Sequence, residues 1–79
     1  MNPLTGTDKD DLIKLANRMK TLRLKKGAHH YEKFALRNGI ARVQYRSYEM
    51  GGNITYTSLL RVVRALDVTL DEFFSEGFD

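Results

Sequence analysis

Hydrophobic residues recur at helical spacing near the start of the chain. The pattern predicts a first helix over residues 8–26, capped by Thr7 or Asp8 and ending before Gly27. Its inward positions carry the apolar side chains Leu12, Leu15, Ala16, Met19 and Leu22. Residues 1–7 show no such periodicity, so we expect them to form a flexible N-terminal tail.

Four shorter helices are predicted beyond this first one. Glycine marks their ends, because it adopts the left-handed backbone of tight turns, and threonine marks their starts as an N-cap. The turn signals are Asn38-Gly39 and Gly51-Gly52, and the start signals are Thr55 and the capping-box pattern of Thr69 and Glu72. The expected helices span residues 31–38, 42–50 and 56–66, with a short fifth helix that carries Leu70, Phe73 and Phe74. No strand pattern occurs, so the prediction is a compact all-α domain of five helices over residues 8–79.

Composition limits what so short a chain is able to do. With 79 residues, of which 42% are hydrophobic, it buries about 60% of its unfolded surface, enough for a small core but not for a spacious catalytic cleft. The lack of cysteine excludes disulfides and thiolate metal sites and fits a reducing cytoplasm. The polar start, MNPLTGTDKDD, has no signal-peptide segment, and no apolar run reaches the length of a membrane span.

The net charge of +3 is unevenly distributed along the chain. Residues 14–64 contain twelve Lys and Arg against only Glu32 and Glu49, a balance of +10, whereas residues 1–13 and 65–79 have balances of −2 and −5. A basic middle between acidic ends suggests a polyanionic partner. Solvated helix faces that happen to use Lys and Arg would give the same counts.

Catalytic and metal-binding patterns are weak in this sequence. His29 and His30, with Glu32, suggest a metal site, but without cysteine or a further histidine the ligand set is incomplete. The two histidines fit the turn before a helix, where one of them could contact a phosphate. No arrangement of nucleophile, base and orienting group can be assembled, so we expect no enzyme, no metal and no cofactor.

The segment FALRNGIARVQYRSYEMGG, residues 34–52, combines features that a helix-turn-helix needs. Ala35 is small enough for a close helix crossing, and Gly39 tolerates positive φ at the turn. The second helix has a narrow anchoring stripe made of Ile40, Tyr45 and Tyr48. Its other face then presents Arg42, Val43, Gln44, Arg46 and Ser47. In the DNA major groove, Arg pairs with guanine, Gln with adenine, and Val contacts a thymine methyl group; the alternative is a merely solvated face.

From LRLKKG through FALRNGIARVQYRSYEMG to SLLRVVRALDVTLDEFF, the chain resembles the Cro/repressor-type (XRE-like, lambda-repressor-like) helix-turn-helix DNA-binding domains. The resemblance covers about residues 19–74 and lies in the order and spacing of Arg23, Ala35, Gly39, Ile40, Glu49, Gly51 and Ala65–Val68. The segment between Gly27 and Ala35 is one residue longer than the common pattern. The residue aligned with the usual start of the second helix is therefore either His30 or Tyr31.

The resemblance implies sequence-specific binding to double-stranded DNA and transcriptional regulation. It implies a homodimer on a two-fold operator with residues 42–50 in the major groove. Bases would be read by Arg42, Val43, Gln44 and Ser47, with Arg46 reading a base or touching phosphate. Phosphates would be contacted from the second helix by His30, Tyr31 and Lys33, and from the following loop by Gly52, Asn53, Thr55 and Tyr56. Arg23 would form a partly buried ion pair with Glu49.

The last seven residues contain three aromatic side chains, which exceeds what a small domain readily buries. We therefore expect Phe74 and Phe78 to contribute to a homodimer interface. The same fold could serve a stand-alone repressor or the antitoxin of a toxin pair. An alternative of another class is an adaptor that binds a protein instead of DNA. A membrane partner is not expected.

Overall fold

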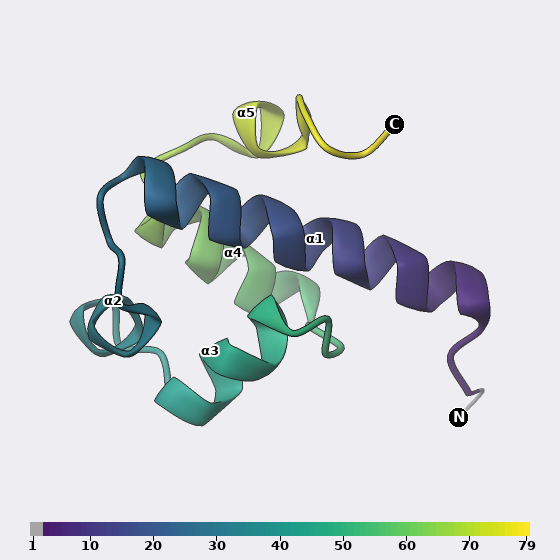
Figure 1. Cartoon of the computed structure of the whole chain (residues 1–79), viewed down its shortest axis with the longest axis horizontal. Coiled ribbons are helices and arrows are strands. Elements are labelled where there is room, and N and C mark those ends of the chain that lie inside the picture. Colours follow the sequence, from purple (N-terminus) through teal and green to yellow (C-terminus); the bar gives the residue numbers. More distant parts are fainter. Residues whose placement is uncertain (1–2) are drawn as a thin grey trace.

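The structure is a computed structural model that describes residues 3–79 (Figure 1). It contains α1 (Gly6–Lys25), α2 (Tyr31–Arg37), α3 (Arg42–Glu49), α4 (Tyr56–Ala65) and α5 (Leu70–Phe74), and no strand within the described residues. The long α1 crosses the molecule, with α5 on one side and α2 and α3 on the other. The predicted all-α, five-helix fold is confirmed.

The helix α1 begins two residues earlier than its pattern predicts. Thr5, rather than Thr7 or Asp8, is the N-cap: its hydroxyl accepts a hydrogen bond from the Asp8 N–H at 3.1 Å. The Asp8 carboxylate in turn accepts one from the Thr5 N–H at 2.9 Å, which completes a capping box and lowers the pKa of Asp8. Residues 6 and 7 of the expected tail are therefore helical, while residues 1 and 2 lie outside the described part of the chain.

The remaining helix limits follow the sequence signals to within one residue. Gly27 takes a φ of 87° directly after the C-cap of α1. The hydroxyl of Thr55 caps α4 by accepting from Ser58, and Thr69 forms the predicted capping box with Glu72 at the start of α5. Local hydrogen bonds thus fix most of the helix boundaries.

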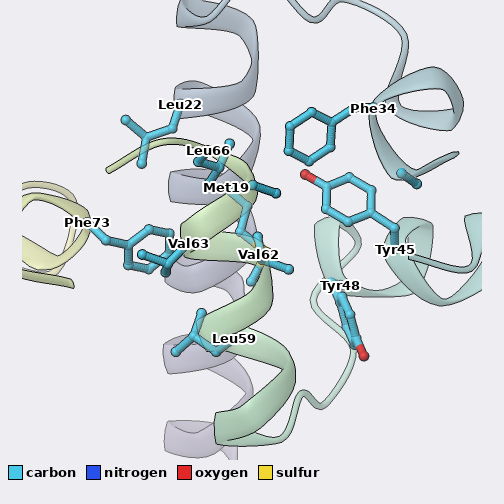
Figure 2. Packing of buried hydrophobic residues seen from close by; sticks show 12 residues of the cluster. Met19, Leu22, Phe34, Tyr45, Tyr48, Leu59, Val62, Val63, Leu66 and Phe73 are labelled. Atoms are coloured by element: carbon cyan, nitrogen blue, oxygen red, sulfur yellow. The ribbon is translucent and has the colours of Figure 1, made fainter. Parts of the chain in front are cut away.

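The hydrophobic core lies between α1 and the four shorter helices. Figure 2 shows Phe34 and Tyr45 entering it from the side of α2 and α3, and Phe73 from the side of α5. The rings of Phe34 and Tyr45 lie 5.3 Å apart between centroids. The cluster of buried residues comprises Met19, Leu22, Phe34, Ala35, Tyr45, Tyr48, Leu59, Val62, Val63, Ala65, Leu66 and Phe73.

Cations on α1 and at its C-cap bind backbone carbonyls elsewhere in the fold. The buried Arg18 donates through Nε to the Phe73 carbonyl at 2.7 Å and through Nη2 to the Glu72 carbonyl at 2.8 Å. Lys26 donates to the Ala65 carbonyl at 2.9 Å and pairs with Asp67. Arg18 and Lys26 belong to the basic middle of the sequence, but they stabilise the C-terminal ends of α5 and α4 instead of facing a polyanion.

Candidate nucleic-acid interface

A closed turn joins α2 to α3. The Ile40 N–H donates to the Ala35 carbonyl at 2.9 Å, and the Asn38 amide donates to the Phe34 carbonyl at 2.8 Å. Gly39 has a φ of 67°, which a residue without Cβ adopts at little cost. Ala35 is completely buried, so its small side chain permits the close approach of the two helices.

The helix α3 is held on one side and open on the other. Tyr45 is 0% exposed, Tyr48 is also buried, and Ile40 is half-buried. The opposite surface displays all five side chains that the sequence assigns to base reading, each of them exposed: Arg42, Val43, Gln44, Arg46 and Ser47. A recognition helix requires this arrangement, because buried residues on one side hold it against the domain while the other side remains free to contact DNA.

The exposed side chains of α3 divide between two flanks. A shallow hollow beside the start of α2 is lined by Tyr31, Arg42, Val43, Arg46, Ser47 and Met50. Gln44 instead lines a separate hollow toward α4, together with Tyr48, Ser58 and Arg61. The structure therefore brings four of the predicted base-reading residues together and sets Gln44 apart from them.

Met50 belongs to this face but was not singled out from the sequence. It is 71% exposed and follows Val43 by seven residues and Ser47 by three, which is the spacing of one helix face. Because Met50 stands next to Gly51, the sequence identifies it as the end of the helix. Its place on the same helix face as Val43 and Ser47 is then easily overlooked. The periodicity of the exposed positions would have identified it. Arg61, which faces Gln44 from α4, was missed as well.

A buried ion pair fixes the C-terminal end of α3 to α1. Arg23 Nε lies 2.7 Å from Glu49 Oε2, and Arg23 Nη2 lies 2.9 Å from Glu49 Oε1. The two side chains are only 5% and 10% exposed, and the Glu49 carboxylate raises the pKa of Arg23. Glu49 is the one acid of α3, so with its charge paired inward every charge on the exposed face of α3 is positive.

Tyr45 packs beside this ion pair. Burial, and after it the Glu49 carboxylate, raise the pKa of the Tyr45 hydroxyl far above its usual value, so the side chain remains neutral. A neutral, fully buried ring is an anchor for α3 and is not available to a ligand.

The start of α2 presents part of the predicted phosphate-binding set. His30 is the N-cap of α2 but forms no side-chain hydrogen bond with the helix, and both His30 and Lys33 are exposed. Tyr31 is half-buried and packs against the core while lining the hollow beside α3. These residues lie on the α2 side of the reading face.

The loop between α3 and α4 presents the rest of that set. The Gly52 N–H donates to the Ser47 carbonyl at 2.8 Å, so the loop lies against the end of α3. A Cβ atom at Gly52 would clash with Ser47 Oγ and lie 2.9 Å from the Ser47 carbonyl oxygen, so only glycine fits there. Asn53 and Tyr56 are exposed, whereas the Thr55 hydroxyl is engaged in capping α4.

Other kinds of site are not formed by the described residues. Within residues 3–79, no group of three or more histidines or carboxylates is gathered closely enough to hold a metal ion. None of the described helices combines the length and the apolar character that crossing a bilayer would require. The exposed face of α3 is therefore the surface that calls for a functional interpretation.

Two short helices joined by a glycine turn, the second exposed along one face, define a helix-turn-helix domain. The model of the family described as "Helix-turn-helix" (HTH_3) matches residues 19–73, and the chain belongs to this family. It is a Cro/repressor-type helix-turn-helix domain, of a family of non-enzymatic DNA-binding regulators. No curated protein and no solved structure matches the chain.

Proposed function

We propose that the chain binds specific sequences of double-stranded DNA and regulates transcription by placing α3 in the major groove. The observation that carries this proposal is the construction of α3. Buried Tyr45 and Tyr48 and the ion pair of Glu49 hold the helix, and its outer face has exposed Arg42 and Arg46 and no unpaired acid. An α-helix fits the major groove, where its side chains reach base edges.

Each predicted contact has a place in this proposal. Arg42, Val43, Arg46 and Ser47 face the floor of the groove, and Gln44 meets a base at its edge because it lies on the α4 flank. Phosphates on the two sides of the groove are contacted from the start of α2 and from the loop before α4. The residues for these contacts are His30, Tyr31, Lys33, Gly52, Asn53, Thr55 and Tyr56.

We further propose that the protein acts as a homodimer on a two-fold operator. Phe74 is 44% exposed, and its ring lies 4.8 Å from that of Phe78, so the pair forms an aromatic surface at the C-terminal end of α5. A second copy of the chain would cover it. The cysteine-free composition supports a place in the cytoplasm. Stand-alone repressor and toxin-neutralising antitoxin are both compatible with such a dimer.

Selection of bound sequences from a random pool of duplex DNA tests the proposal. We expect a two-fold symmetric motif, and an affinity for it that falls with salt. Contacts with about six phosphates give a slope near −5 in log K against log salt concentration. An adaptor that binds only a protein would give no motif and little DNA binding at about 50 mM salt, and this outcome would replace the proposed function with the adaptor.

Two single variants separate base reading from phosphate contact. Arg42→Ala is expected to cost about 1–3 kcal/mol at the selected site and to relax discrimination at one base pair. Lys33→Ala is expected to weaken binding to all sequences alike, because a phosphate contact carries no sequence information. Competition binding against a panel of single-base changes measures both effects. An unchanged preference in Arg42→Ala would show that this residue does not read a base.

A further inference from the structure

Two exposed apolar side chains lie on the cationic face of α3, one at each end of the helix. Val43 is 76% exposed and Met50 is 71% exposed, and both line the hollow beside the start of α2. Neither side chain supports the core, which is built from the opposite side of the helix. Their exposure has no explanation in the stability of the fold.

The surroundings of Val43 and Met50 indicate the kind of surface that covers them. Arg42 and Arg46 line the same hollow, and Lys33 is exposed on the neighbouring helix. The only acid of α3, Glu49, is paired with Arg23 and nearly buried. An apolar strip between unpaired cations is complementary to a polyanion that carries apolar groups between its charges.

The major groove of DNA has this composition. Phosphates line its two sides, and on its floor the only apolar group that a base pair presents is the C5 methyl of thymine. Val43 lies in the first turn of α3 and Met50 directly after its last residue, so they would meet methyl groups at separate base pairs.

We propose that Met50 recognises the 5-methyl group of a thymine, in addition to the thymine methyl contact expected of Val43, so that each half-site contains thymine at the positions these two side chains contact. Met50 thereby becomes a specificity-determining residue in addition to the five expected from the sequence. This inference rests on the proposed function, because it names the chemistry that the same face of α3 reads.

Replacement of thymine by deoxyuridine in the selected duplex tests the proposal, since it removes the methyl group and leaves base pairing unchanged. Binding of the full chain is measured with each thymine of one half-site replaced in turn. Loss of one buried methyl contact is expected to weaken binding of the wild-type chain about fourfold. The Val43→Ala and Met50→Ala variants are each expected to bind the thymine duplex more weakly and to lose sensitivity to deoxyuridine at one position.

Leu36→Ala is the matched control, because Leu36 is an equally exposed aliphatic residue on α2 outside the hollow. It is expected to keep the wild-type response to deoxyuridine. Circular dichroism checks that all three variants keep their helix content. Positional loss of the deoxyuridine effect in Val43→Ala or Met50→Ala, but not in Leu36→Ala, supports the proposal.

Three outcomes overturn it. The first is a selected half-site without thymine, and the second is a deoxyuridine effect below twofold at every position. The third is an effect that remains the same in all variants. In each of these cases the chain still selects a DNA sequence, so the proposed function survives. Failure to select any sequence refutes the proposed function, and this inference falls with it.

Discussion

At the scale of single residues, burial decides what an ion pair contributes. Arg23 and Glu49 are almost completely removed from water and share two short hydrogen bonds. Lys26 and Asp67 also pair, but their side chains are 39% and 74% exposed. Water screens the second pair and not the first, so the two pairs are expected to differ in their effect on stability.

Glu49→Ala is expected to lower the free energy of unfolding by about 3–5 kcal/mol, because it leaves the buried Arg23 charge without its counter-ion and with only the Ala28 carbonyl as an acceptor. Urea denaturation followed by circular dichroism measures the change. Asp67→Asn is the control, with an expected loss of less than about 1 kcal/mol. Asparagine tolerates the left-handed backbone at this position, where φ is 58°, so only the charge is removed. Equal losses in the two variants would contradict this assignment of the pair.

The sequence identifies some of these residues better than others. Tyr45 and Tyr48 stand three residues apart, which is the spacing of one helix face, and the opposite side of the helix is then the free face. The sequence gives only a weak indication that Arg18 is buried. It lies among Leu15, Met19 and Leu22 on the apolar side of α1, where a cation needs a partner. Its partners are the carbonyls of residues 72 and 73, and no local pattern indicates a contact over 55 positions.

At the scale of elements, α1 holds the end of α5 through one side chain. Both carbonyls that Arg18 binds belong to the last turn of α5, and its guanidinium also lies 3.6 Å from Glu76. A helix of five residues has few hydrogen bonds of its own, so its stability depends on such outside contacts.

Arg18→Met is expected to destabilise the protein by about 1–3 kcal/mol, because it removes the donor of the Phe73 carbonyl and leaves the Glu72 carbonyl with Ser75 alone, while an unbranched side chain still fills the site. The backbone amides of α5 should exchange with solvent faster in this variant than in the wild type, and by a larger factor than those of α4, as measured by hydrogen exchange. Lys20→Met, at an exposed position of the same helix, should change neither quantity. Unchanged exchange in α5 would show that Arg18 does not anchor it.

Helix limits were accessible from sequence because they depend on neighbouring residues. Gly27, Gly39, Thr55 and Thr69 mark turns and caps through their own backbone and side-chain chemistry. The start of α1 was misplaced because TGTD, residues 5–8, offers three possible caps, and the capping box that decides among them forms only in the folded turn.

At the scale of the whole molecule, the aromatic surface at the C-terminal end of α5 determines the expected assembly. Phe73 is fully buried and Phe78 is half-buried against it, whereas Phe74 is 44% exposed. Phe74 is therefore the residue whose loss should affect association more than folding.

Phe74→Ser is expected to shift the protein from dimer toward monomer, as measured by light scattering over a range of concentrations. The physical reason is the loss of exposed aromatic area that a second copy would cover. Leu36→Ser removes an exposed apolar side chain from α2 and should leave the dimer intact. A wild-type chain that is monomeric at all concentrations, or a dimer that persists in Phe74→Ser, would contradict this interface.

The hydrogen bonds from Arg18 to the distant α5 have a practical consequence for the choice of a shortened fragment of this protein. The region shared with the family starts at residue 19, one position after that arginine. A fragment cut there would retain the turn and the recognition helix but would lose the guanidinium that fastens the last helix. The boundary of homology and the boundary of the cooperative folding unit therefore differ, and expression of the minimal domain should begin upstream of Thr5.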